Sequence, residues 1–272
     1  MMRRVLFCAV AGLVIAAGIH AAVPPAVTPT SQPMVAIIID DLGNSLAEGK
    51  QTVNLPGPVA CAILPHTEFA TQIADLAHTQ HKQVLLHLPM EAISDKPLGP
   101  GGIRLDMTQE EIQDTVRGDI AAIPHLIGVN NHEGSLMTQH PGDMAWVMQV
   151  LAKTPGLFFV DSYTSVNSVA YGVAREYGVP AARRNVFLDD IETQPAVEYQ
   201  FRRLLSIARR DGYALAIGHP HPATLAVLAR ELPQLEARGF RLVPVSEIVK
   251  LQQTHPLQLP ATLFPPSLLL KR

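Results

Sequence analysis

The sequence of 272 residues has little cysteine, few aromatic residues and no excess of positive charge. Its two cysteines, Cys8 and Cys61, are too few for a disulfide framework or for a zinc site made of thiolates. A formal net charge of −3 provides no basic surface that would favour nucleic acid as a partner. Any metal ion in this protein must therefore be held by carboxylates and by some of its 11 histidines.

The first 22 residues have the pattern of a secretory signal peptide. Arg3 and Arg4 form a basic start, an apolar run follows over 5–19, and small residues at 21–22 offer a cleavage site. The run is shorter than the roughly 20 residues that a membrane span needs. We therefore predict a signal peptide over 1–22, export to the periplasm and no stable membrane span after cleavage. An uncleaved membrane anchor is the alternative.

The rest of the chain divides into three parts by composition. Residues 23–34 are rich in proline and threonine, which predicts a linker without regular structure. Residues 252–272 are predicted to be a proline-rich tail. The part between them, 35–251, is long enough and apolar enough for a single large core, and we predict one folded domain there.

Short apolar runs alternate with helical patterns along this domain. Unbroken apolar strands are typical of sheets buried on both faces, and strand–helix alternation is typical of parallel sheets. No glycine-rich dinucleotide fingerprint follows the first run, where Asp-Asp-Leu-Gly stands at 40–43. The pattern favours an α/β fold, a distorted (β/α) barrel of about seven parallel strands, over an open doubly wound sheet. The predicted strands are 35–39, 59–64, 84–88, 127–129, 157–160, 186–188, 214–217 and 241–245, and the predicted helices are 68–81, 108–123, 143–153, 168–177, 195–210 and 223–238.

Acidic and histidine side chains follow most of the predicted strands, at the point where each strand ends. The carboxyl ends of parallel strands meet at one rim of a barrel, where the sites of such folds form, so we expect these side chains to lie together. Arg183 and Arg184 precede the run at 186–188 and are expected at the opposite end. The rim residues are Asp40, Asp41, His66, His87, Glu91, Asn131, His132, Ser135, Asp161, Asp189, Asp190, His219 and His221.

Asp40 and Asp41 are adjacent carboxylates at the end of the first predicted strand. Like charges this close resist joint ionisation, so a nearby cation is expected, or a raised pKa on one of them. Successive side chains of a strand point to opposite sides, and the two need a bend to converge. Gly43 permits one. The alternative is an Asx-turn that caps a helix starting near Ser45.

His87 ends an apolar strand, and His132 lies in a loop rich in Asn, Gly and Ser. One aspartate and two histidines with an open position form a common layout for a catalytic divalent ion such as zinc, which activates water and polarises a carbonyl. His219 is a candidate general acid, with His221 as its competitor. Histidines that only form structural hydrogen bonds are the alternative.

Asp-Asp-Leu-Gly at 40–43 resembles the Asp-Asp-Gly motif of the polysaccharide deacetylases of the NodB-homology group. Four more motifs follow in order: HLPMEA at 87–92, GVNNHEGSLMT at 128–138, FFVDS at 158–162 and AIGHPHP at 216–222. Together they resemble the divergent branch of that family, and the resemblance covers about 35–250.

The resemblance implies a distorted barrel, a divalent metal, and removal of N- or O-acetyl groups from glycans by metal-activated water. It implies Asp40 as general base, Asp41 as a metal ligand and His219 as general acid. The family's second motif, His-Ser/Thr-x-x-x-His-Pro, is absent. Only His87 and Glu91 stand there, and the divergent branch's Asn-Asn-His-x-Gly-Ser implies His132 as the replacement ligand.

The leading hypothesis is a metal-dependent hydrolase of cell-envelope carbohydrate, a polysaccharide deacetylase that uses zinc. Asn131 or a backbone N–H is expected to stabilise the oxyanion, and Glu91, Ser135 and Asp161 are expected to orient the ligands. The alternative is a weak or inactive envelope protein that binds or regulates glycans on the same barrel. The altered ligand set and the 5% aromatic content favour that alternative. Hydrolysis of a non-glycan ester or phosphoester ranks last, because no basic cluster lies at the rim.

Overall fold

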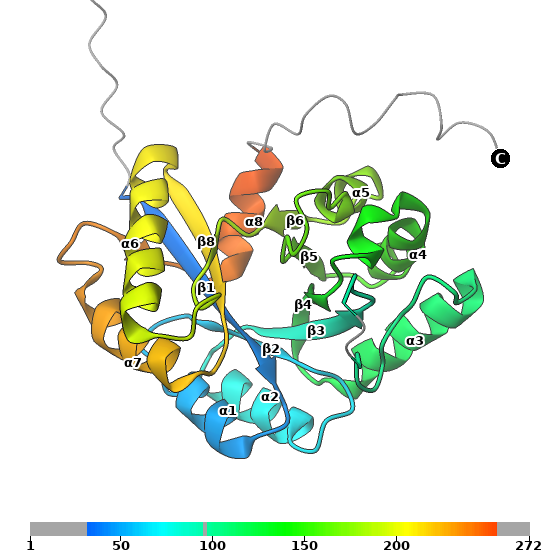
Figure 1. Cartoon of the computed structure of the whole chain (residues 1–272), viewed down its shortest axis with the longest axis horizontal. Helices are drawn as coiled ribbons and strands as arrows, with labels where there is room; N and C mark the ends of the chain where they lie inside the picture. The colour runs from blue at the N-terminus through cyan, green and yellow to red at the C-terminus, as the bar shows by residue number, and fades with distance from the viewer. Residues whose placement is uncertain (1–31, 95–96, 255–272) are drawn as a thin grey trace, which may run out of the picture. The chain divides into compact units, whose positions relative to one another are not determined.

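The computed structural model describes residues 32–94 and 97–254. Strands and helices alternate along this part of the chain (Figure 1). The predicted signal peptide, most of the predicted linker and most of the predicted tail lie outside the described residues. The elements are β1 (Met34–Leu42), α1 (Leu46–Val53), β2 (Ala60–Ile63), α2 (Ala70–Thr79), β3 (Val84–Met90), α3 (Gln109–Ala122), β4 (Leu126–Glu133), α4 (Pro141–Ala152), β5 (Phe158–Asp161), α5 (Ala170–Glu176), β6 (Ala181–Arg183), β7 (Val186–Phe187), α6 (Gln194–Asp211), β8 (Tyr213–Gly218), α7 (Pro222–Glu231), β9 (Arg241–Leu242) and α8 (Val245–Thr254).

The strands form one parallel sheet in the order β6-β5-β4-β3-β2-β1-β8-β7, with β9 added beside the start of β1. The two end strands, β6 and β7, are joined by two residues that bridge the gap. Arg184 N donates to the Asp161 carbonyl on the β5 side, and Asn185 N donates to the Leu215 carbonyl on β8. The sheet thus curls into a distorted (β/α) barrel, and the predicted fold class is confirmed.

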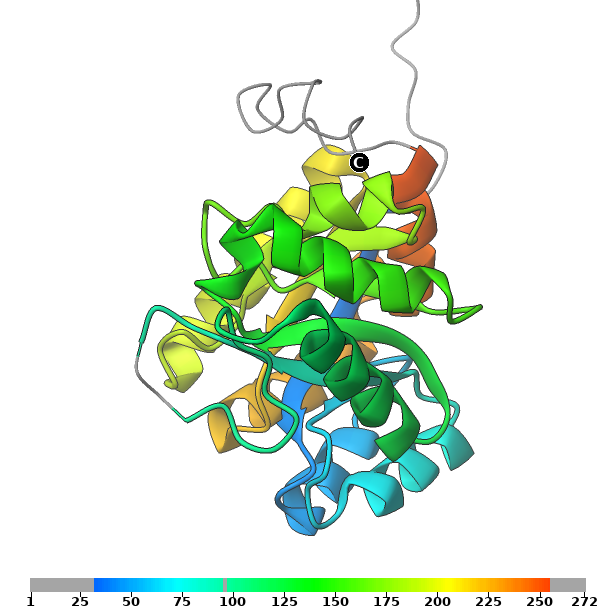
Figure 2. The same cartoon turned by 90° about the vertical axis from the view of Figure 1, so that its right-hand side faces the viewer.

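Alternation along the strands divides the core into two layers. Side chains on one face, such as Ile37 and Ile39, pack against the outer helices, and α3 and α4 of this outer layer face the viewer in Figure 2. Side chains on the other face, such as Ile38, Leu85 and Ile217, fill the barrel together with the apolar side of α8. Each fully buried aliphatic side chain stabilises the folded state by roughly 1.5–3 kcal/mol. Side chains two positions apart on a strand point to the same face, so the positions two residues after Ile38, Leu85 and Ile217 also face inward. These positions are Asp40, His87 and His219.

Several boundaries differ from those predicted. Helix α1 and strand β6 were not predicted, because α1 is only moderately apolar and β6 is three residues long. Helix α8 was not predicted either: the predicted strand over 241–245 is only two residues long as β9, and α8 begins at Val245. The predicted helix over 223–238 ends at Glu231, since Pro233 cannot donate the backbone bond that would continue it. Helix α8 runs past 251 into the predicted tail, because buried Gln252 bonds to the backbone of Arg183.

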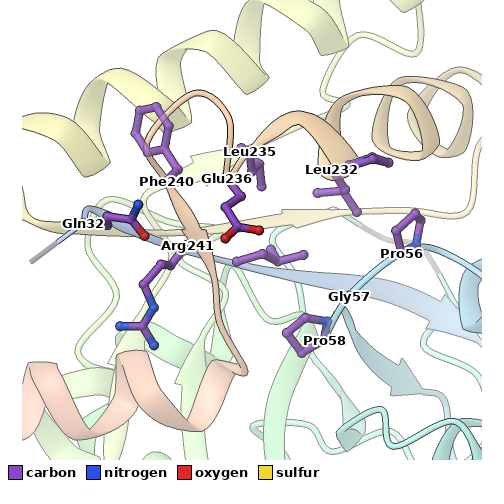
Figure 3. A pocket seen from close by; sticks show the side chains of 11 residues that line it. Gln32, Pro56, Gly57, Pro58, Leu232, Leu235, Glu236, Phe240 and Arg241 are labelled. Carbon is purple, nitrogen blue, oxygen red and sulfur yellow. The ribbon is translucent and has the colours of Figure 1, made fainter.

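A cavity of about 470 Å³ lies at the amino-terminal end of the strands (Figure 3). It is bordered by the loop before β2 and by the segment that leads from α7 into β9, including Glu236 and Arg241. None of its lining residues belongs to the rim at the carboxyl ends. No helix within the described ranges is both long and apolar enough to span a membrane.

Candidate metal centre

A cavity of about 130 Å³ opens at the carboxyl ends of the strands. Its walls come from the ends of β1, β3, β4 and β7 and from the loops that follow β5 and β8. The strands bring to one place side chains that are up to 179 positions apart in the chain, as expected for the rim of a parallel barrel. The lining residues are Asp40, Asp41, His87, Asn131, His132, Glu133, Ser162, Thr164, Phe187 and His219.

The bend that joins the two aspartates lies at Asp41 itself. Its φ of 58° is left-handed, which costs energy for any residue but glycine. The register between β1 and β2 also shifts between Ile39 and Leu42. We predicted that Gly43 would supply the bend, and Gly43 does have a positive φ, but the chain has already turned before it. The helix-cap alternative is wrong for Asp41, because Ser45 caps α1 by accepting from Glu48 N.

Three potential ligand atoms converge in the cavity. Asp41 Oδ1 lies 2.8 Å from His132 Nδ1 and 3.1 Å from His87 Nε2, and the two ring nitrogens are 3.2 Å apart. Ligand atoms around a tetrahedral zinc ion with bonds near 2.0–2.1 Å are separated by about 3.3 Å. The residues that the sequence singled out as ligands therefore have the spacing of a metal site, and they form a potential metal-binding group.

Hydrogen bonding around these atoms also suits a cation. His87 Nδ1 lies 3.0 Å from Asn130 Oδ1, so Nδ1 carries a proton and Nε2 is the ring nitrogen that faces Asp41 Oδ1. Burial by itself lowers the pKa of His87, but Asp40, Asp41 and the bond to Asn130 outweigh burial and raise this pKa, so a metal bound at Nε2 would replace a proton there. Asp41 Oδ1 is buried, yet no described residue gives it a well-aligned hydrogen bond. Burial by itself raises the pKa of Asp41, but His132 and His87 outweigh burial and hold this pKa far below its usual range. An ionised oxygen without an aligned donor, between two imidazole nitrogens, fits a divalent metal.

Asp40 lies beside the three potential ligands but has other hydrogen-bond partners. Its side chain is almost fully buried, Oδ1 accepts a 2.9 Å bond from Asn130 Nδ2, and Oδ2 is 3.5 Å from His87 Nε2. Burial raises the pKa of Asp40, although the nearby His87 and His219 work against that rise. Oδ2 is the oxygen left free to exchange a proton.

His219 faces Asp40 and Asp41 from the end of β8. Its Nδ1 lies 3.0 Å from Asp189 Oδ1, and its Nε2 lies 3.8 Å from Asp41 Oδ2. Burial alone lowers the pKa of His219, but the bond to Asp189 and the charges of Asp40 and Asp41 raise it to about 9. Its competitor His221 does not line the cavity and lies 3.5 Å from Glu192 instead.

The predicted supporting residues lie in different places. Asn131 lines the cavity, but its side chain accepts from Ser162 N and donates to the Glu133 carbonyl. Asp161 is the buried last residue of β5, and it accepts bonds from Ser168 Oγ, Tyr163 N and Tyr171 N. Glu91 and Ser135 lie outside the lining and accept from Leu105 N and Ile93 N, so they hold the segment between β3 and α3.

For three residues that support the site, no role in it was predicted. Asn130 contacts both Asp40 and His87, but no signal in the sequence separates it from its neighbour Asn131. Asp189 was placed at the rim without a role. Arg184 was expected at the far end, but it follows β6 at the rim and donates to the Ser162 and Tyr163 carbonyls.

A second pocket of about 370 Å³ adjoins the cavity and shares Asp41 and His132 with it. Its other walls are uncharged, and many are aliphatic or proline side chains. They comprise Asn44, Leu64, Pro65, Thr67, Pro89, Pro97, Leu98, Gly99 and Pro100. This pocket provides room for a neutral group next to the candidate metal ligands.

A family model described as divergent polysaccharide deacetylase matches residues 37–249, almost the whole barrel. This chain belongs to the divergent polysaccharide deacetylase family. The resemblance drawn from the five sequence motifs is thereby confirmed. The match includes every candidate ligand and both candidate proton-transfer residues.

Two relatives and two solved structures are similar to this family member. Uncharacterized protein YibQ of Escherichia coli (strain K12) is 40% identical over 194 residues, covering 71% of this chain but 60% of YibQ, less than two thirds of that protein. An uncharacterized protein of Haemophilus influenzae is 37% identical over 207 residues, covering 75% of this chain and 74% of that protein.

The solved structures share the fold. Uncharacterized protein ATU2773 from Agrobacterium tumefaciens C58 has a TM-score of 0.77 at 24% identity, covering 81% of this chain and 91% of its own. Peptidoglycan deacetylase PdaC from Bacillus subtilis has a TM-score of 0.50 at 12% identity, covering 82% and 94%. At 24% and 12% identity, these two structures show that the chain shares their fold.

Proposed function

We propose that this protein is a metal-dependent hydrolase that removes acetyl groups from a cell-envelope polysaccharide. One observation carries the proposal: Asp41 Oδ1, His87 Nε2 and His132 Nδ1 lie within 3.2 Å of one another, between Asp40 and His219. Three ligands from the chain leave a position open for water or substrate, as catalytic zinc sites do. When bound, the metal supplies Lewis-acid activation of water and of the acyl carbonyl.

Asp40 and His219 divide the proton transfers. Asp40 Oδ2 is free of the Asn130 bond that holds Oδ1, so Oδ2 accepts the proton from the attacking water. His219 Nε2 is free of the Asp189 bond that holds Nδ1, so Nε2 donates a proton to the leaving nitrogen or oxygen of the sugar. The raised pKa of His219 keeps this ring protonated near neutral pH.

The carbohydrate substrate follows from the family to which the chain belongs. The 370 Å³ pocket beside Asp41 and His132 is the proposed place of the sugar next to the acetyl group. We further propose that the protein acts after export, in the periplasm, as the signal-peptide pattern predicts. PdaC, by its description, is a peptidoglycan deacetylase, and peptidoglycan glycan strands are therefore a sensible first substrate.

The test is release of acetate by the purified, zinc-loaded protein from acetylated chitooligosaccharides and from peptidoglycan glycan strands. We expect release that stops with a chelator and resumes with added zinc. Glycan binding without acetate release would favour the binding or regulatory alternative. Turnover of aryl esters alone would contradict the carbohydrate part of the proposal.

A further inference from the structure

Asn130 is the one side chain of the described site that bonds to both the candidate base and a candidate metal ligand. Its Nδ2 donates to Asp40 Oδ1 at 2.9 Å, and its Oδ1 lies 3.0 Å from His87 Nδ1. A third bond runs from Nδ2 to Ser162 Oγ at 3.3 Å. The side chain is fully buried, so water does not compete for these bonds.

The direction of each bond follows from the groups involved. An ionised Asp40 can only accept, so the amide of Asn130 must turn its nitrogen toward Asp40. Its oxygen then faces His87, and an oxygen can only accept, so His87 Nδ1 must be the protonated nitrogen. His87 Nε2, the atom 3.1 Å from Asp41 Oδ1, is then the ring nitrogen that gives up its proton when a metal binds.

We propose that Asn130 is a positioning residue that prepares the metal ligand and the base together. Its Oδ1 keeps the proton of His87 on Nδ1, so that Nε2 is the nitrogen available to a metal. Its Nδ2 donates to Asp40 Oδ1, so that Asp40 Oδ2 faces the cavity. This inference rests on the proposed function for its catalytic half only. Its structural half concerns the metal-free chain and stands on the hydrogen bonds alone.

Two substitutions separate the two halves. Asn130→Ala removes both bonds. Asn130→Asp keeps an acceptor for His87 Nδ1 but replaces the amide donor to Asp40 with a second carboxylate, which shares a proton with Asp40. Asn131→Ala is the matched control for the tautomer, because Asn131 is the neighbouring buried amide and bonds to Ser162 N and the Glu133 carbonyl, not to His87.

The first measurement is the nitrogen NMR spectrum of His87 in the metal-free protein, together with zinc affinity by calorimetry. At a pH high enough to make the His87 ring neutral, we expect the Nδ1-protonated tautomer alone in the wild type and in Asn131→Ala. In Asn130→Ala we expect a tautomer mixture and zinc binding weaker by about 10- to 100-fold. A folded Asn130→Ala protein with the wild-type tautomer and affinity would overturn the inference.

The second measurement is kinetic. Asn130→Asp should bind zinc at least as tightly as the wild type, yet lose kcat with little change in KM, because Asp40 no longer receives the amide donor and shares a proton with the new carboxylate instead. Wild-type kcat in zinc-loaded Asn130→Asp would overturn the catalytic half. If the wild type itself releases no acetate while the tautomer and affinity change as expected, the proposed function fails and the positioning role stands. Melting temperatures confirm that each variant is folded.

Discussion

Asp40 and Asp41 are consecutive residues whose carboxylates reach one cavity, because Asp41 adopts a left-handed φ of 58°. The bend gives the two side chains different surroundings. Asp40 is held by Asn130 in the buried wall, and Asp41 lies between two imidazoles. The difference in surroundings is what allows adjacent carboxylates to have separate roles.

Asp41→Ala and Asp40→Asn should therefore have different effects on metal content. Asp41→Ala removes a ligand and should lose most of the bound zinc as well as the activity. Asp40→Asn leaves the three ligands intact and should keep the zinc while turnover falls by about 10²- to 10⁴-fold, the range of a lost general base. Elemental analysis and acetate release measure the two effects. Full zinc occupancy in Asp41→Ala would refute the ligand assignment.

Asp189→Asn should move the alkaline limb of the activity profile. His219 must be protonated to act as an acid, and its pKa is raised to about 9, chiefly through the bond to Asp189 and against the effect of burial. Activity should fall as the pH rises through about 9 in the wild type, and at lower pH in the variant. The raised pKa also stabilises the folded chain fully below pH 6.5, and this stabilisation is lost as the pH rises through 9. An unmoved limb in the pH–rate profile would exclude His219 as the acid.

Asn44→Trp should obstruct the neutral pocket beside the ligands. Asn44 is exposed at its edge, so the larger ring can enter the pocket without disturbing the core. We expect KM for an acetylated oligosaccharide to rise several-fold with kcat nearly unchanged, the pattern of weakened ground-state binding. Ala47→Trp is the control, because Ala47 is exposed on α1 and outside the pocket lining. Equal kinetics for the two variants would place the substrate elsewhere.

Asp119→Asn should stabilise the fold above pH 6. The Asp119 side chain is buried on α3, and burial raises its pKa to about 6 despite the His66 ring at 2.8 Å. Because the folded pKa is raised, this stabilising contribution is present below pH 3.8 and lost as the pH rises through 6. At pH 8 the variant should gain on the order of 1 kcal/mol, or about 2–4 °C in Tm. Thermal melts at pH 8 and pH 4 test this, since no gain is expected at pH 4.

Asp114→Asn is the control for that comparison. Asp114 is exposed on the same helix and paired with Arg117, so its substitution should bring no gain that grows with pH. A gain of the same size at both pH values in Asp119→Asn would point to packing instead of charge.

The sequence could predict the rim because strand ends are readable from it. His87, His132 and His219 each follow an apolar run, and a parallel barrel brings such ends together. Asn130 could not be separated from Asn131 in the same way, because choosing between neighbours requires knowing which residues of β4 face inward. Arg184 was missed for a different reason. Strand β6 is three residues long and is separated from β7 by two residues, so no separate apolar run marked the strand that Arg184 follows.

The most direct measurement is the position of zinc in a crystal of the zinc-loaded protein, located by anomalous diffraction at the zinc edge. The account predicts one strong peak about 2.0–2.2 Å from Asp41 Oδ1, His87 Nε2 and His132 Nδ1. A fully loaded protein with its zinc bound elsewhere, or with these three side chains free of metal, would contradict it.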